Sequence, residues 1–327
     1  MFITGGQKID NDKPINPIRK VITSGDIDER EIYQGTNNIV NYTLYENGDL
    51  VIDAQGYGVL KTYTSDSYGV MGDVVNNFIN NSEEFTEEEK GLISAMQEMI
   101  IMLCSISVED FNTSFGTSAT SYMELIQAMA GLEGDTLTQV STIVDKLVDS
   151  KLAGTTKNLI INEGVTAIGD YAFAARTFGN VTVPASVNTI AEEAFSATVV
   201  LKELNFLPTT LEYIWDSSLG FQAPNYILDL NIIAEDKVDR LNSYTVLGDA
   251  KLKGIILPSY ESYTSFSHTI NSVKEVYVPA NITSLMLSLD NAPDEGVTYY
   301  MEGPQRAISG FDPNGSDVKE VHWNYTW

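Results

Sequence analysis

The residues that most often carry enzyme chemistry are scarce in this sequence. It has one cysteine, Cys104, and two histidines, His268 and His322, which leaves few groups for nucleophilic or acid–base catalysis. Motifs of the GxGxxG, P-loop, GxSxG and HExxH types are missing. A single cysteine also excludes an intrachain disulfide and a multi-cysteine metal site. We therefore predict a protein without enzymatic activity, cofactor or bound metal.

Three local patterns contain metal- or redox-competent groups but have plainer interpretations. The segment Asp312-Pro-Asn-Gly-Ser-Asp317 is rich in oxygen ligands, yet it lacks the EF-hand spacing and is predicted to be a turn. Cys104 lies within an apolar helical pattern and is predicted to be an unreactive core thiol. His322 lies in a strand-like pattern and is predicted to be a strand-surface residue.

The charge balance narrows the class of partner. The 327 residues include 45 Asp and Glu against 19 Lys and Arg, a formal net charge of −26. Such a polyanion repels phosphate backbones, so nucleic acid is not expected as a partner. No apolar run approaches the roughly 18 residues of a membrane-spanning helix. The first eight residues also lack the apolar region of a secretory signal. We expect protein partners and no membrane insertion.

One pattern repeats from residue 157 onward. Leu159-x-Ile161 leads after ten residues to Ala172-Phe173, and the same pattern recurs 22 positions later, ending at Ala194-Phe195. A Val-Lys-Glu-Val motif ends at Val276 and again at Val321, and the related Leu-Lys-Glu-Leu motif ends at Leu204. The repeats place eight strand starts at residues 159, 181, 204, 228, 255, 276, 297 and 321.

A period in the low twenties is typical of a solenoid, in which each repeat forms one rung. One rung buries about five apolar side chains, at ~1.5–3 kcal/mol each. Ordering its 22 or so residues costs ~1.5 kcal/mol per residue, about 30 kcal/mol in total. A single rung is therefore unstable, and stability requires stacking on neighbouring rungs.

The repeats resemble the BspA-like leucine-rich repeats of bacterial surface proteins. The resemblance depends on the Val-x-x-Ile-x-x-x-Ala-Phe pattern in 165–173 and 187–195, and on the Val-Pro turn at Val183-Pro184. It implies that Phe173 and Phe195 fill the solenoid interior. A hairpin element that often precedes such arrays is similar to residues 44–56, through Leu44, Gly48, Leu50, Ile52 and Gly56.

The elements before the repeats have other periods. Alternating apolar residues around Asn47-Gly48 predict a β-hairpin with a type I′ turn. Thr86 and Glu89 form a capping-box pattern before an apolar helix period over 92–103, and two more helices are predicted around 122–129 and 135–148. We predict an α+β fold: residues 1–73 form an N-terminal arm and hairpin, 74–156 a small helical bundle, and 157–327 a leucine-rich-repeat solenoid of about eight rungs.

Strand alternation indicates where a ligand could bind. The residue between the two inward apolar positions of each rung faces outward, so stacking forms one exposed column. We predict that this column binds protein or glycan. A solvated sheet face, or one covered by the N-terminal region, is the alternative. The aromatic residues Tyr325 and Trp327 form a second candidate interface, with packing in a terminal cap as the alternative. The column comprises Ile160, Thr182, Asn205, Asp229, Ile256, Tyr277, Thr298 and His322.

These observations predict a non-enzymatic structural or binding protein. We expect a bacteriophage virion component, such as a tail, baseplate or fibre protein, that forms a homo-oligomer and contacts other virion proteins or the host surface. The uncleaved Met1 favours this setting weakly. A secreted or cell-surface bacterial adhesin is the alternative, and a carbohydrate-active enzyme is a remote third.

Overall fold

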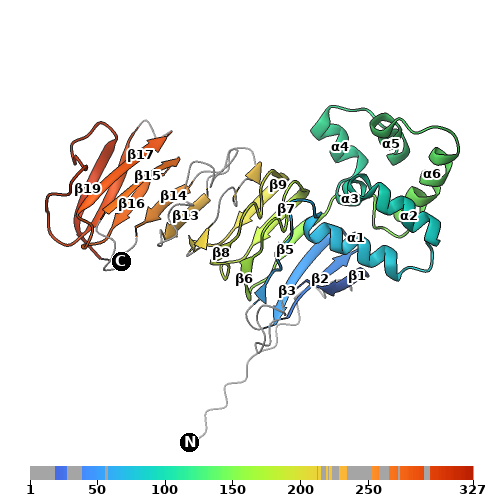
Figure 1. Cartoon of the computed structure of the whole chain (residues 1–327), viewed down its shortest axis with the longest axis horizontal. Coiled ribbons are helices and arrows are strands. Elements are labelled where there is room, and N and C mark those ends of the chain that lie inside the picture. The colour runs from blue at the N-terminus through green and yellow to red at the C-terminus, as the bar shows by residue number, and fades with distance from the viewer. Residues whose placement is uncertain are drawn as a thin grey trace, which may run out of the picture.

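The computed structural model shows an elongated molecule in which β-strands stack along the long axis (Figure 1). The helices gather at one end, beside the first strands, and the last strand lies at the other end (Figure 1). The structure describes residues 19–27, 39–55, 58–211, 213–214, 219, 221–222, 228–233, 252–257, 265–271, 273–290 and 295–326. The predicted α+β solenoid is confirmed.

A seven-stranded sheet forms one wall of the first half. Its order is β1 (Val21–Asp26), β2 (Ile39–Tyr45), β3 (Asp49–Gln55), β5 (Asn158–Ile161), β7 (Thr177–Val183), β9 (Thr198–Phe206) and β12 (Phe221–Gln222). The first three strands are antiparallel, and each later strand pairs in parallel with the one before it in the sheet. The predicted hairpin therefore joins the repeat sheet directly, since β3 pairs with β5.

A four-stranded parallel sheet forms the opposite wall, in the order β11 (Tyr213–Ile214), β8 (Thr189–Ile190), β6 (Val165–Ile168) and β4 (Gly58–Val59). The apolar side chains of both walls meet between them. Phe173 and Phe195 are fully buried there, and their rings stack with centroids 5.3 Å apart. Their predicted place in the solenoid interior is confirmed.

The second half has its own sheets. Six parallel strands follow the order β10 (Thr210–Leu211), β13 (Leu228–Ile233), β14 (Leu252–Ile256), β16 (Glu275–Val278), β18 (Val297–Glu302) and β19 (Val318–Tyr325). A parallel pair, β15 (Ser265–Asn271) and β17 (Ser284–Asp290), lies beside them. All eight predicted strand starts fall within described strands, but these belong to two sheets rather than one. The count of eight complete rungs stays a prediction.

Polar side chains tie the first two rungs together at the repeat spacing. The carboxylate of Glu163 accepts hydrogen bonds from the backbone N–H of Ala185 (3.2 Å) and Ser186 (3.1 Å), which lie one rung later. Asp170 Oδ1 accepts from the N–H of Glu192 in the same way, at 3.0 Å. These bonds satisfy turn N–H groups that have no place in a strand ladder, so they specify the stacking register as well as stabilising it.

Six helices lie between β4 and β5: α1 (Gly69–Asn81), α2 (Glu87–Ala95), α3 (Gln97–Ser105), α4 (Val108–Phe115), α5 (Tyr122–Ala130) and α6 (Gly134–Asp149). The capping box is confirmed, because Thr86 and Glu89 exchange both bonds. The single helix predicted over 92–103 is wrong. Its apolar period continues, but Met96 leaves the helical conformation (φ −117°, ψ 24°) and divides it into α2 and α3.

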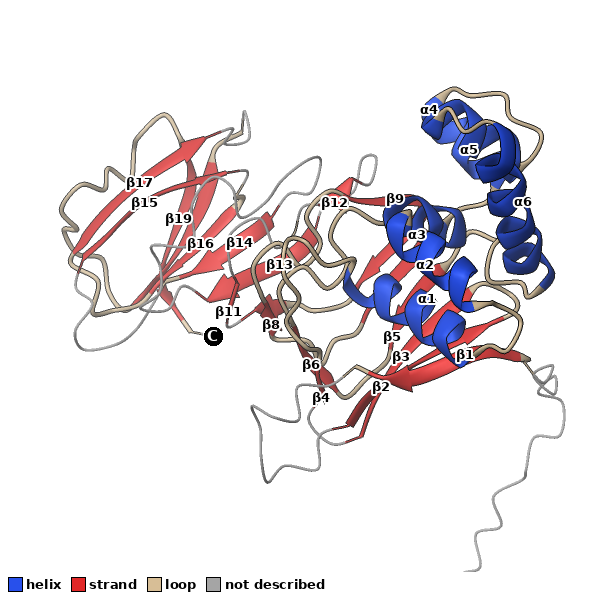
Figure 2. Cartoon of the chain, turned by 45° about the vertical axis from the view of Figure 1, so that its right-hand side comes forward, coloured by secondary structure: helices blue, strands red, loops and turns tan. Residues whose placement is uncertain are grey.

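Helix α1 closes the end of the solenoid interior. Asn77 Nδ2 donates to the hydroxyl of Tyr42 at 2.6 Å, and Tyr42 is buried on the inward side of β2. The N–H of Val70 donates to the carbonyl of Ala172, which ties the start of the helix to the first rung. Figure 2 shows α1 beside β1, β2, β3 and β5. The helical residues thus cover apolar surface that the first rung would otherwise expose.

The turn of the hairpin differs from the prediction. A type I′ turn needs positive φ at both central residues, yet Gly48 (φ 89°) has a positive value and Asn47 does not. The N–H of Gly48 donates to the carbonyl of Tyr45, and Leu44 pairs with Leu50. This is the longer loop in which a turn ends on a left-handed glycine. A Cβ at Gly48 would lie 2.9 Å from the carbonyl oxygen of Thr156.

Candidate binding face of the solenoid

The first half of the predicted column lies in register on the seven-stranded sheet. Ile160 pairs with Thr182, and Thr182 pairs with Asn205. Val51 of β3 extends the column by pairing with Ile160. Ile160, Thr182 and Asn205 are half-buried, whereas Val51 is buried. The structure therefore places three of the predicted residues side by side on the outward face.

The second half of the column has a different register from the predicted one. Ile256 pairs with Tyr277, but Tyr277 then pairs with Tyr300, and Tyr300 with His322. Thr298 lies two residues earlier on β18, opposite Glu275. Val297 and Tyr299 are both buried, so alternation of buried and outward residues is satisfied whether Thr298 or Tyr300 lies beside Tyr277. A slip of two residues keeps every side chain on its own face, which is why the pattern alone did not exclude it.

Asp229 also lies outside the column. Ile256 pairs with Ile233 of β13, four residues after Asp229, and the register of β13 is irregular between Leu228 and Asn231. The irregularity is typical of a β-bulge, which changes the count of residues along one strand. Asp229 thus lies on β13, but the residue of β13 that pairs with Ile256 is Ile233.

Stacked aromatic rings distinguish the C-terminal part of this face. The Tyr277 and Tyr300 rings stack with centroids 4.8 Å apart and planes 13° apart. The imidazole of His322 continues the stack, 5.1 Å from Tyr300 and tilted by 14°. Tyr325 leans across it, 4.6 Å from Tyr300. We call Tyr277, Tyr300, His322 and Tyr325 the aromatic row.

A local irregularity places Tyr325 in the aromatic row. Simple alternation would put it on the face of Trp323, two residues earlier. Asn324 adopts a left-handed conformation (φ 61°), and the pairing shifts so that Tyr325 lies opposite Glu302 while Trp323 lies opposite Met301. One extra residue therefore turns Tyr325 to the face of His322. Asparagine tolerates this conformation better than most residues do.

An acidic row runs beside the aromatic row. Glu275 pairs with Thr298, and Thr298 pairs with Glu320. Tyr277 donates a hydrogen bond from its hydroxyl to Glu275 Oε2 at 2.8 Å. His322 Nε2 lies 3.4 Å from Glu320 Oε2. We call Glu275, Thr298 and Glu320 the acidic row.

The environment of Tyr277 keeps its hydroxyl protonated. Burial raises the pKa of Tyr277 above its usual range, and the hydrogen bond to Glu275 and that carboxylate's charge raise the pKa further. The face therefore presents the neutral Tyr277 ring and its neighbouring rings next to the acidic side chains of Glu275 and Glu320. Such a surface suits a cation whose aliphatic stem lies along aromatic rings while its charged end meets a carboxylate.

Sequence reasoning found Tyr277 and His322 but missed Tyr300. A repeated sequence pattern could have indicated Tyr300. In it a buried or half-buried residue directly precedes an outward ring, as in Val276-Tyr277, Tyr299-Tyr300 and Val321-His322. Aligning them gives spacings of 23 and 22, close to the period of the first repeats. Trp327, the other predicted aromatic, lies outside the described residues.

The remaining candidate groups do not assemble into a further centre. Cys104 is fully buried, as predicted, and burial raises the pKa of its thiol to about 12. Asp312 accepts hydrogen bonds within its own segment, from the N–H groups of Asn314 and Gly315. Within the described ranges, no group of three or more His, Cys, Asp and Glu side chains could hold a metal ion.

Comparison with known protein families identifies the repeats. The model of the BspA type leucine rich repeat region matches residues 151–261, in six copies. Residues 151–261 are a BspA-type leucine-rich-repeat region. No curated protein and no solved structure matches the chain.

The BspA-type repeats indicate a broad class of function. Leucine-rich repeats of this kind are typically non-enzymatic and generally mediate protein–protein interaction, and proteins that carry them are often found at surfaces or outside the cell. Among the residues that the structure describes, no helix is both long and apolar enough to cross a membrane.

Proposed function

We propose that this BspA-type repeat protein is a non-enzymatic component of a bacteriophage particle that binds a protein on the host surface. The aromatic row is the observation that carries the binding part of the proposal. Four rings are held on the outward face of the last three rungs, where packing of the interior does not require them. Aromatic anchors flanked by charge are typical of protein-binding surfaces.

The chemistry of this face favours a basic protein segment as the partner. Glu275 and Glu320 flank the rings, and the whole chain has a net charge of −26. Lysine or arginine stems can pack on Tyr300 while their charges meet the acidic row. The charge also speeds the approach of a positive partner.

The shape of the molecule supports the virion setting. The aromatic row lies at one end of the solenoid, and the helices lie at the other (Figure 1). In a tail or baseplate protein, this separation would let one end dock to the particle while the other meets the host. A bacterial cell-surface adhesin is the second candidate, and the frequent surface location of proteins with BspA-type repeats favours it.

Mass spectrometry of purified phage particles tests the setting. The proposal expects peptides of this chain at a fixed ratio to the major tail protein. Recovery of the chain from the bacterial surface, with none in particles, would contradict the virion setting and favour the adhesin. Size-exclusion chromatography with light scattering tests the expected homo-oligomer.

Binding to arrays of basic peptides and of glycans tests the site. We expect basic peptides to bind and Tyr300→Ala to weaken that binding at least about tenfold, as loss of an anchor residue does. Phe115→Ala is the matched control, because Phe115 is an exposed ring (58%) on α4. Equal loss in both variants, or binding to glycans alone, would overturn the proposed protein partner.

A further inference from the structure

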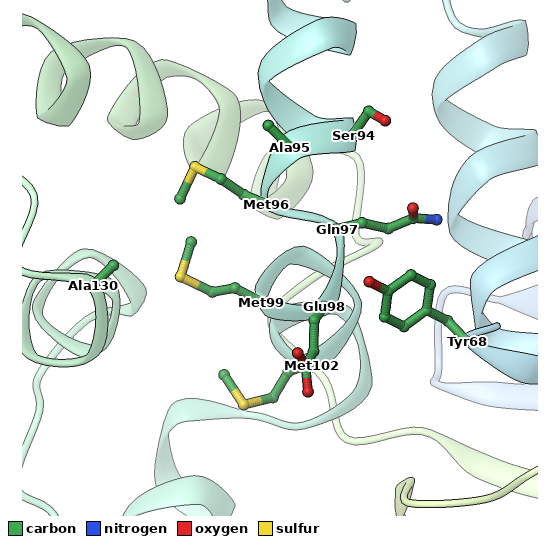
Figure 3. Close-up of a pocket in the computed structure, with 9 residues that line it drawn as sticks. All are labelled: Tyr68, Ser94, Ala95, Met96, Gln97, Glu98, Met99, Met102 and Ala130. Carbon is green, nitrogen blue, oxygen red and sulfur yellow. The ribbon is translucent and has the colours of Figure 1, made fainter. Parts of the chain in front are cut away.

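A groove of about 530 Å³ opens among the helices (Figure 3), and the strands of the aromatic row lie at the other end of the molecule (Figure 1). Met96, Met99 and Met102 line it from the α2–α3 break and α3, and Ala130 lies at the end of α5. Figure 3 shows the three methionine side chains directed toward the side of Ala130, Tyr68 on the opposite side, and Glu98 between them, next to Met102.

The three methionines pack against the buried core and keep part of their surface exposed in the groove. Sequence analysis places them within an apolar helix period, yet all three are half-buried, whereas Ile100 and Leu103 of the same helix are buried. Met99 and Met102 lie three residues apart on α3 and are therefore neighbours, and Met96, at the break before α3, lines the same groove. Methionine is flexible and polarisable, and it lines surfaces that accept differently shaped apolar side chains.

Charge around the groove restricts the occupant. Glu98 is the charged residue among those that line it. Arg176 lies over the Tyr68 ring at 5.9 Å, and its Nε donates to the carbonyl of Ala174. Its charge interacts with that of Glu98, so it offsets one negative charge beside the groove. Between residues 69 and 151 the sequence has 14 Asp and Glu against three Lys. A positive partner is favoured here, and a second copy of this acidic chain is disfavoured.

We propose that this groove binds an amphipathic helix of a partner protein, with apolar side chains against Met96, Met99 and Met102 and a basic residue at Glu98. A groove between helices that is lined by methionine accepts apolar anchors spaced along one face of a helix. The site is separate from the aromatic row, so the protein has two surfaces for two different partners.

Methionine methyl resonances report directly on this groove. The chain, labelled at its nine methionine methyl groups, is titrated with a synthetic helical peptide of leucine and lysine whose leucines recur at positions i, i+3, i+4 and i+7. We expect the resonances of Met96, Met99 and Met102 to shift. Those of buried Met71 and of Met286, which is 55% exposed on β17, should stay in place.

Control peptides and variants separate the groove from non-specific attraction. A scrambled peptide of the same composition, and a leucine–glutamate peptide of the same pattern, should leave the groove resonances unshifted. Met99→Gln should weaken binding at least about fivefold, because it puts an amide against an apolar anchor. Met286→Gln should not change the affinity. An unchanged Met71 resonance verifies that the Met99→Gln variant folds.

Several results would overturn the proposal. One is an equal shift at Met286, and another is equal binding of the scrambled peptide. Binding of the glutamate peptide would show that the charge argument is wrong. Shifts that depend on protein concentration without peptide would identify a second copy as the occupant. None of these results would bear on the aromatic row.

Discussion

Lys157 has no exposed surface, although a lysine carries a charge at neutral pH in most environments. Its Nζ donates to the carbonyl of Thr155 at 2.9 Å. Its backbone N–H donates to the carbonyl of Ser105, the last residue of α3, and its carbonyl accepts from the N–H of Gly179 in the next rung. Burial lowers the pKa of Lys157 to about 8. The backbone of Lys157 therefore connects the helices to the solenoid. Its buried side chain lowers the stability of the fold whenever the amine is protonated.

Lys157→Met should stabilise the protein at neutral pH and change how its stability depends on pH. Between pH 8 and 10.5 the unfolded wild type binds more protons than the folded one, so its free energy of unfolding rises with pH. The variant lacks this rise. At pH 7 we expect it to be more stable by about 1–3 kcal/mol, after the lost bond to Thr155 is deducted.

Urea unfolding at several pH values measures this difference. Burial raises the pKa of Cys104 and the Lys157 charge partly opposes that rise, so the comparison isolates Lys157 only below about pH 9, where the thiol stays protonated in both proteins. Lys202→Met, at an exposed position of β9, is the control and should retain the wild-type pH dependence. A Lys157→Met variant less stable than wild type at pH 7 would mean that the lysine is not penalised by burial.

At the scale of the element, stacking depends on bonds that connect consecutive rungs. The Glu163 carboxylate bonds to two backbone N–H groups of the next rung, and Ser186 Oγ returns a bond to the carbonyl of Val165 at 2.7 Å. We expect Glu163→Ala to lower the free energy of unfolding by about 1–2 kcal/mol, because two turn N–H groups lose their acceptor. Glu193→Ala is not a suitable comparison, since Glu193 has a left-handed backbone (φ 50°).

A control for this role comes from an acidic side chain outside the rung-to-rung bonds. Glu203→Ala, at an exposed position of β9, should cost less than about 0.5 kcal/mol. Chemical denaturation checks both variants, and equal losses would contradict the role given to Glu163.

The elements that sequence reasoning located are those with a strong internal period. Phe173 and Phe195 lie 22 residues apart within matching patterns, so their common place in the interior followed from repetition. Thr86 and Glu89 marked a helix start because capping requires that spacing. In both cases local chemistry and global packing favour the same structure.

The elements that sequence reasoning missed have weak or ambiguous local signals. Helix α1 begins at Gly69 after Tyr68, without a side-chain cap. The break at Met96 occurs inside an unbroken apolar period, and the two registers of β18 bury equally apolar residues. Tertiary packing decides these features, so the methionine groove could not be assigned from the pattern alone, whereas the spacing of Tyr277, Tyr300 and His322 could have indicated Tyr300.

At the scale of the whole molecule, a solenoid transmits a defect mainly to neighbouring rungs. Phe195 stacks on Phe173 and is fully buried. Phe195→Ala should cost about 3–5 kcal/mol by leaving a cavity. Hydrogen exchange should quicken in β6 to β9 and stay unchanged in β18 and β19. Loss of protection of equal size at both ends would indicate a single cooperative unit instead.

The central claim is that stacked rungs align the aromatic row, with Tyr277 directly beside Tyr300. Neighbouring strands lie about 4.8 Å apart, which a disulfide can bridge, whereas an offset of two residues adds about 6.6 Å along the strand. Under mild oxidation, the Tyr277→Cys, Tyr300→Cys double variant should therefore form an intrachain disulfide, detected by mass spectrometry, and the Tyr277→Cys, Thr298→Cys variant should not. Cys104 is buried and should not interfere. A disulfide that forms only with the Thr298→Cys change would contradict the register and the aromatic row with it.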